Sequence, residues 1–224
     1  MPRTTRVNQG GLVYHALNRA NLGLRIFDSD DDYAAFERIL EEAVDRYDMR
    51  LLSYCVMPNH WHLVVWPRED GDLSLFVGWL TLTHTQRWHA NRKTAGGGHL
   101  YQGRFKSFLV DTDEYMLTVG RYVERNPLRA NLVERAEDWQ FGSAFRRCEG
   151  STEEKAILSD WPIERPRQWR RFVNQALTPA EEEAVRKSLQ RGVPYGSPDW
   201  TSEMIAQFEL DSTVRKRGRP KKGP

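Results

Sequence analysis

The stretch that most constrains the fold is Met57 to Pro67, MPNHWHLVVWP, in which two histidines flank one tryptophan at the start of an apolar run. A strand from His60 to Trp66 would place alternate side chains on opposite faces of a sheet. His60 and His62 would then share one face, while Trp61 would anchor the strand from the other. Two neighbouring neutral imidazoles suit one metal ion. The alternative is a pair of half-exposed histidines on an edge strand.

The composition is that of a folded globular domain with one substantial core. The chain has 224 residues, of which 39% are hydrophobic and 29% charged. Its apolar runs reach about six residues, far short of a membrane span, and the N-terminal MPRTTRVNQGG has no secretory h-region. We therefore expect a cytoplasmic protein with no membrane partner. The chain has two cysteines, Cys55 and Cys148, which is too few for a disulfide framework. Cys55 is expected to be a buried residue that fills space in the core.

Positive charge is concentrated at the C-terminus. The net charge is +2, but the last ten residues carry +6, which leaves −4 for residues 1–214. The basic residues of this run are Arg215, Lys216, Arg217, Arg219, Lys221 and Lys222. A compact basic run beside a nearly neutral body indicates a polyanionic partner, above all nucleic acid, so the protein is expected to be nucleoid-associated. A solvated basic terminus without a partner is the alternative.

Within this run, KRGRPKK resembles an AT-hook. The narrow, negative minor groove of A·T-rich DNA attracts inserted arginines, here Arg217 and Arg219. Arg215 and Lys221 would contact the neighbouring phosphates. The competing interpretation is a basic tail that only raises nonspecific affinity.

Hydrophobic periodicity predicts strands over 11–19, 50–56, 60–66 and 100–110, with a bulge at Gly103, and helices over 30–47, 72–91 and 112–126. The order favours an α+β fold, with an antiparallel sheet and helices on one face. On the first strand, His15 could approach the histidine pair as a ligand, although a packed core histidine is the simpler interpretation.

The last of these helices carries a second group of polar residues. Tyr115, Val119, Tyr122 and Asn126 fall on one stripe, and Pro127 should stop the helix. The amide oxygen of Asn126 could be a third metal ligand, with Tyr122 beside the same ion. Otherwise the tyrosines are core aromatics and Asn126 is a C-cap.

Together, His60-Trp61-His62 and the segment from Tyr122 to Pro127, YVERNP, resemble the single-tyrosine HUH transposases, and more closely the REP-associated tyrosine transposases. Further matching pieces are Tyr14-His15, Asn18-Arg19, the segment from Tyr101 to Lys106, Asp138-Trp139 and Ser143. The resemblance covers about residues 11–147, and it implies the ferredoxin-like HUH endonuclease fold. Autonomous transposases usually have glutamine four residues after the tyrosine, whereas this chain has Asn126, as the REP-associated branch does.

The resemblance implies transesterification on single-stranded DNA. His60, His62 and Asn126 would hold Mg²⁺ or Mn²⁺, and Tyr122 would attack the scissile phosphorus to form a 5′-phosphotyrosine. A zinc site that includes Cys55 lacks a clear fourth ligand. The expected partner is single-stranded or hairpin DNA, with Arg104 and Lys106 among the contacts. Tyr101 and Phe105 could stack on unpaired bases, or simply pack in the sheet.

The domain organisation follows from composition and turn signals. We expect a transposase/nuclease domain at 1–147, a linker at 148–160, a small helical unit at 161–212 and the basic tail at 213–224. Thr178-Pro179 and Ser197-Pro198 are helix starts, and the two helices could form a helix-turn-helix, although packing onto the first domain is simpler. The alternative functions are a noncatalytic DNA-binding regulator and another HUH enzyme, such as a plasmid relaxase or replication initiator. The protein could be a monomer or a homodimer.

Overall fold

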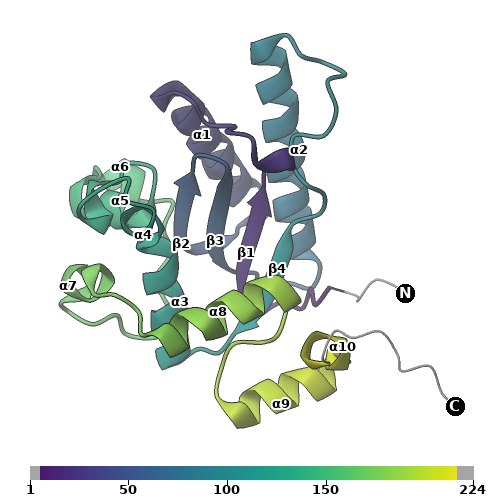
Figure 1. Cartoon of the computed structure of the whole chain (residues 1–224), viewed down its shortest axis with the longest axis vertical. Coiled ribbons are helices and arrows are strands. Elements are labelled where there is room, and N and C mark those ends of the chain that lie inside the picture. The colour runs from purple at the N-terminus through teal and green to yellow at the C-terminus, as the bar shows by residue number, and fades with distance from the viewer. Residues whose placement is uncertain (1–5, 216–224) are drawn as a thin grey trace, which may run out of the picture.

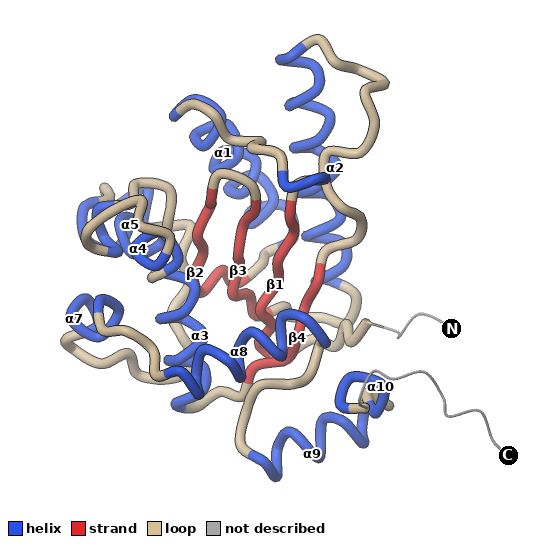
Figure 2. Tube along the Cα trace, viewed as in Figure 1, coloured by secondary structure: helices blue, strands red, loops and turns tan. Residues whose placement is uncertain are grey.

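A four-stranded antiparallel sheet forms the centre of the protein. The computed structural model describes residues 6–215, and its strands are β1 (Val13–Arg19), β2 (Arg50–Met57), β3 (His60–Trp66) and β4 (Lys106–Val110). They lie in the order β2-β3-β1-β4, and each neighbouring pair is antiparallel (Figure 2). A helix connects β1 to β2, and another connects β3 to β4. This is the predicted ferredoxin-like α+β arrangement, which is confirmed.

Helices α1 (Asp30–Tyr47) and α2 (Asp72–Arg92) cover one face of the sheet (Figure 1). Their apolar stripes pack against the side chains that β3 sends to this face, Trp61, Leu63 and Val65. Trp61 is fully buried, and its indole N–H donates to the hydroxyl of Tyr101 at 3.0 Å. The predicted alternation of β3 is therefore present, with Trp61 holding the strand in the main core.

Helices also cover part of the opposite face, where the sequence prediction had placed none. Helix α3 (Glu114–Glu124) and helix α8 (Pro179–Arg191) lie there (Figure 1). The strands present apolar side chains to this side as well, so a second core forms between them and the stripe of α3. Its strand residues include Val13, Leu52, Val64, Phe108 and Val110. Because both faces of the sheet are apolar, one layer of helices cannot bury them.

The fourth strand is shorter than predicted, because residues 100–105 do not continue it. Strand β4 begins at Lys106, and Tyr101 instead forms an isolated bridge with Ala20, just beyond β1. The Tyr101 hydroxyl is bonded in the core to Trp61, which draws this segment away from the line of β4. Gly103 is not a bulge within a strand but a loop residue with φ +142°, a conformation that favours glycine.

The chain after α3 is mostly short helices. These are α4 (Asn126–Arg129), η2 (Ala136–Asp138), α5 (Ser143–Glu149), α6 (Thr152–Lys155), α7 (Trp169–Asn174), α9 (Pro198–Gln207) and α10 (Asp211–Val214), with η1 (Asn21–Gly23) earlier in the chain. Helix α3 ends at Glu124, two residues before the predicted end. Pro127 lies in the first turn of α4, where its missing N–H and fixed φ are tolerated.

The segment predicted as a linker packs against the sheet. Residues 148–160 contain α6, and Leu158 forms a parallel bridge with Leu51 at the edge of β2. Beyond it, α8 has the predicted capping box between Thr178 and Glu181 and ends at Gly192 in the left-handed conformation. Tyr195, between α8 and α9, bridges to Val110 of β4, so this connection docks on the sheet edge.

No helix within residues 6–215 is long and apolar enough to cross a membrane. In the same part of the chain both cysteines are free, and Cys55 is buried as expected.

Candidate active site

A cleft of about 510 Å³ opens where β1, β3 and the loop before β4 meet α3 and α8. His60, His62 and Tyr122 line it, and so do five basic residues: Arg6, Arg19, Arg104, Lys106 and Arg129. Among the described residues that form its walls there is no Asp or Glu. Four of these cations, all except Arg129, have no ion-pair partner within residues 6–215. The cleft is therefore strongly electropositive and suited to a polyanion.

The two histidines of β3 lie on the same face of the sheet, as their spacing predicted, with ring centroids 4.9 Å apart. Strand β3 lies between β2 and β1, which rules out the alternative of two histidines on an edge strand. His62 is only 2% exposed. The two rings thus stand side by side on the wall of the cleft, and both belong to the central strand β3.

Both imidazoles are neutral at physiological pH. Burial, with the nearby charges of Arg19 and Arg129, lowers the pKa of His60 to about 3. Burial, together with His60, holds the pKa of His62 well below its ordinary value. Nδ1 of His60 is 2.6 Å from the amide oxygen of Asn59, which can only accept a hydrogen bond. His60 therefore carries its hydrogen on Nδ1 and has a lone pair on Nε2.

His15 of β1 lies behind the pair rather than in the cleft. Its Nε2 is 2.9 Å from Nδ1 of His62, and its ring stacks on Phe108 with a centroid distance of 4.9 Å. The residue is completely buried, and its own Nδ1 has no hydrogen-bond partner within residues 6–215. The structure thus places His15 in contact with a histidine of the pair, but not in a position to be a ligand itself.

Helix α3 brings Tyr122 to the same cleft. Its ring centroid is 6.0 Å from that of His62, in an edge-to-face arrangement. Two residues on, the carboxylate of Glu124 is fully buried and accepts from the Ser143 hydroxyl at 2.6 Å and the Trp169 indole N–H at 2.7 Å. These bonds hold the end of α3 in place. Tyr115, which lies two positions before Tyr122 on the same stripe of α3, packs on Tyr195 outside the cleft walls.

Asn126 is not in the cleft. Its amide oxygen accepts from Arg129 Nη2 at 2.6 Å, and its amide nitrogen donates to the Tyr122 carbonyl at 3.2 Å. The structure therefore brings together three of the four predicted site residues, His60, His62 and Tyr122. The oxygen of Asn126 is turned to Arg129.

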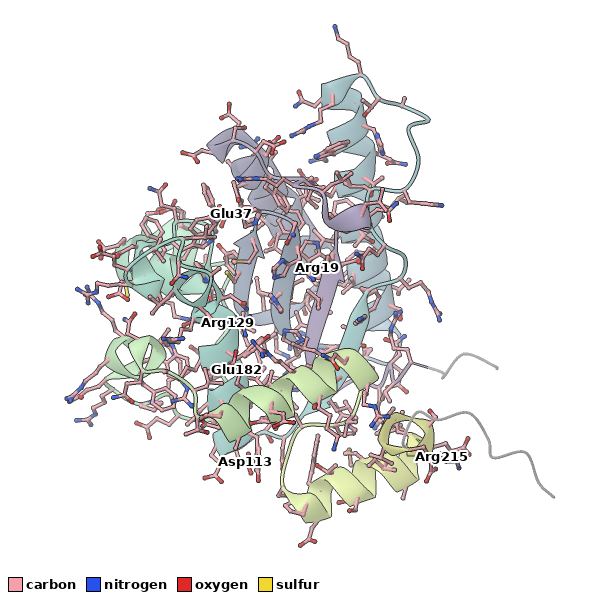
Figure 3. The ribbon with its side chains drawn as sticks, viewed as in Figure 1. Arg19, Glu37, Asp113, Arg129, Glu182 and Arg215 are labelled. Atoms are coloured by element: carbon pink, nitrogen blue, oxygen red, sulfur yellow. The ribbon has the colours of Figure 1, made fainter. Side chains whose placement is uncertain are left out.

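Arg129 is a site residue that sequence reasoning missed. Its guanidinium lies 4.5 Å from the centroid of the Tyr122 ring. Nη1 of the same guanidinium is 3.1 Å from the carboxylate of Glu182 on α8, and Figure 3 labels these two residues. The sequence feature that could have indicated it is its position one turn after Asn126, at the end of a short helix with Pro127 in its first turn. This position does not predict where the side chain points, because Arg129 is oriented by Glu182, which is far away in sequence.

Sequence comparison identifies the family. The model of the family described as "Transposase IS200 like" matches residues 8–126, more than half of the chain. The chain belongs to the IS200-like transposase family. The resemblance inferred from the sequence is thereby confirmed. The family match includes the histidine pair, Tyr122 and Asn126, whereas Arg129 and α8 lie beyond it.

Two relatives of this transposase are informative. A Haemophilus influenzae protein provisionally named a REP-associated tyrosine transposase is 23% identical over 119 residues, which make up 50% of this chain and 68% of the relative. A solved structure of a REP-associated tyrosine transposase bound to a REP hairpin is 18% identical and aligns with a TM-score of 0.53, over 65% of this chain and 84% of that one. The similarity to this solved structure shows a shared fold.

The predicted DNA contacts of this transposase are only partly in the cleft. Arg104 and Lys106 line it. Tyr101 does not line the cleft, because it is a core residue whose hydroxyl is 2.6 Å from His84 Nδ1. Of the two predicted roles of Tyr101, packing in the core is therefore the one observed, and base stacking is not. Phe105 is largely buried under Arg6, whose guanidinium lies 3.5 Å from the ring centroid.

Arg6 is a second residue that the sequence analysis missed, since nothing in its sequence neighbourhood places it beside residue 105.

Of the predicted tail contacts, Arg215 is exposed next to α10, away from the cleft walls. Arg217, Arg219 and Lys221 lie outside the described residues.

Proposed function

We propose that this transposase nicks and rejoins single-stranded DNA at hairpin repeats through a 5′-phosphotyrosine intermediate, with the help of a divalent metal ion. The observation that supports this most directly is the content of the cleft: one phenol, two neutral imidazoles and five cations, without a carboxylate among its described walls. Such a site favours binding of a phosphodiester and offers a single side chain able to form a covalent ester with it.

Tyr122 is the proposed nucleophile. Its hydroxyl oxygen forms a bond to phosphorus while the bond to the 3′-oxygen breaks. The phenolic proton is lost to solvent, and the departing oxygen takes up a proton to become a 3′-hydroxyl. One phosphate ester replaces another, so the strand can be rejoined by the reverse reaction without a nucleotide cofactor. Arg129, beside the Tyr122 ring, is placed to stabilise negative charge on the reacting oxygens.

His60 and His62 would hold the metal ion, which supplies a Lewis acid that neutralises charge on the scissile phosphate. The donor set fits, because both imidazoles are neutral, close together and open to the cleft. Nitrogen donors suit Mn²⁺ at least as well as Mg²⁺, which prefers oxygen. Asn126 would complete the set only after its oxygen leaves Arg129.

The substrate class is proposed from the relatives. One is named for REP association, and another was solved bound to a REP hairpin. In this chain, Arg19, Arg104 and Lys106 have no ion-pair partner within residues 6–215 and are free to contact the backbone of an unpaired strand. We infer a palindromic repeat that folds as a hairpin with an unpaired segment beside its foot.

A noncatalytic DNA-binding regulator is the second candidate. Two observations favour it: the Asn126 oxygen is bonded to Arg129, and residues 6–215 contain no cluster of three His, Cys, Asp or Glu side chains able to hold a metal. In that case the cations would bind the repeat without covalent chemistry.

The deciding experiment is to incubate the protein with hairpin-forming oligonucleotides from the repeats that flank its own gene, with Mn²⁺ or Mg²⁺, and to resolve covalent adducts on a denaturing gel. We expect an adduct that Tyr122→Phe abolishes and that Tyr115→Phe, on the same helix but outside the cleft walls, retains. Tight binding without an adduct under either metal would favour the regulator. Adducts on plasmid origins or transfer sites, but not on repeats, would favour another HUH enzyme.

A further inference from the structure

We propose that His15 is a positioning residue for the metal site: its Nε2 accepts a hydrogen bond from Nδ1–H of His62 and so leaves the Nε2 lone pair of His62 facing the cleft. The inference rests on the proposed function, in which His62 binds the metal ion.

The geometry allows two arrangements of hydrogen atoms. The two ring nitrogens are 2.9 Å apart, so one of them donates and the other accepts. If His15 donated, His62 would accept at Nδ1 and carry its hydrogen on Nε2, which could then not bind a metal ion. If His62 donates, its Nε2 has a free lone pair. The direction of this one hydrogen bond therefore decides whether His62 can be a ligand.

The charges around the cleft favour the second arrangement. Arg19 and Arg129 line the same cleft as His62. Their positive field repels an N–H that points into the cleft and attracts a lone pair. Glu182 offsets part of the charge of Arg129 from outside the cleft walls, whereas Arg19 has no ion-pair partner within residues 6–215.

The neighbouring histidine shows the same arrangement with its direction fixed. His60 donates through Nδ1 to the amide oxygen of Asn59 and keeps a lone pair on Nε2. His15 would do for His62 what Asn59 does for His60. Metal-binding histidines commonly donate their second ring N–H to an acceptor that sets ring orientation and tautomer. In this protein the acceptor would be a third histidine.

A purely structural role explains His15 less well. The residue is completely buried against Phe108, and its Nδ1 has no partner within residues 6–215. An unpaired polar nitrogen in the core is unfavourable, and phenylalanine would fill the same space without it. The hydrogen bond to His62 is the one polar contact that the His15 side chain makes in the described part of the chain.

The first test observes the tautomers directly. Protein labelled with ¹⁵N-histidine, free of metal and near neutral pH, is examined by long-range proton–nitrogen correlation NMR. We expect His62 to carry its hydrogen on Nδ1, although free histidine in water favours Nε2. A hydrogen on Nε2 of His62 would overturn the inference, whatever the protein does with metals.

The second test compares two variants by calorimetric titration with Mn²⁺. His15→Phe keeps the ring and its stack on Phe108 but removes the acceptor, and we expect about 10- to 100-fold weaker Mn²⁺ binding. His15→Gln restores an acceptor oxygen and should recover most of the affinity. Thermal unfolding and hairpin binding in EDTA should be close to wild type in both, because the cations of the cleft are untouched.

The outcomes separate this inference from the proposed function. A folded His15→Phe that binds Mn²⁺ as the wild type does would overturn the positioning role while leaving the metal site intact. Failure of His15→Gln to recover affinity, with the fold preserved, would also count against it. Wild-type protein that binds no Mn²⁺ would overturn the metal site itself, and this inference with it.

Discussion

Arg129 joins the proposed nucleophile to the C-terminal part of the chain. It stacks on Tyr122, donates to Asn126 and pairs with Glu182 of α8. We expect Arg129→Ala to slow adduct formation about 100-fold in single-turnover assays, the usual size of the loss when one charge-stabilising donor is removed. Arg129→Lys should lie between the alanine variant and the wild type, since it keeps the charge and loses the planar fork.

A matched control for Arg129 is available on α8. Arg186 pairs with the same Glu182 at 2.8 Å, but it is 57% exposed and is not a cleft residue. We expect Arg186→Ala to change the rate less than about twofold, because exposed ion pairs contribute little. Equal losses in the two variants would mean that Glu182, and not the guanidinium beside Tyr122, is what matters.

At the scale of elements, α3 depends on close packing by the chain that follows it. A Cβ on Gly120 would come within 2.4 Å of the Trp161 ring, whose indole N–H donates to the Leu52 carbonyl at 2.7 Å. We expect Gly120→Ala to lower the free energy of unfolding by about 1–3 kcal/mol, as overpacking does. Urea denaturation monitored by tryptophan fluorescence measures this.

Gly78 of α2 is the control for the same substitution in another helix. It is exposed, and a Cβ there would meet nothing within 4 Å. Gly78→Ala should therefore raise the free energy of unfolding by about 0.5–1 kcal/mol, since alanine restricts the unfolded chain and favours helix. If both alanines stabilised the protein, Trp161 would not be packed against α3.

At the scale of the whole molecule, charge is divided between an electropositive cleft and a basic C-terminus on an otherwise acidic chain. Deletion of residues 216–224 removes five positive charges. For A·T-rich duplex we expect the slope of log affinity against log salt to become shallower by about 0.9 for each phosphate that the tail neutralises. Adduct formation on the hairpin oligonucleotide should persist, because the cleft is intact. An unchanged slope would argue against the AT-hook interpretation.

Much of the fold could be predicted from the sequence, because it depends on neighbours in the chain. The apolar period placed α1 and β3 at their observed bounds, and alternation along β3 put His60 and His62 on one face. The capping residues Thr178 and Glu181 placed the start of α8. These features need only local periodicity and local hydrogen bonds.

The order of elements further indicated the ferredoxin-like sheet, and the two-part signature indicated the family, with Tyr122 as the residue most able to act as a nucleophile. The domain division and the metal ligands stay predictions.

The rest was decided by contacts between residues far apart in sequence. The Asn126 oxygen was predicted to face a metal ion, but it is turned to Arg129, which Glu182 holds from 53 positions away. Arg6 reaches the cleft by stacking on Phe105, and His15 bonds to His62 from another strand. Periodicity tells which face a side chain takes, whereas its hydrogen-bond partner depends on which distant segment packs there. The sequence by itself therefore determined the sheet, the paired histidines and the tyrosine helix, and the tertiary structure decided what each of those side chains contacts.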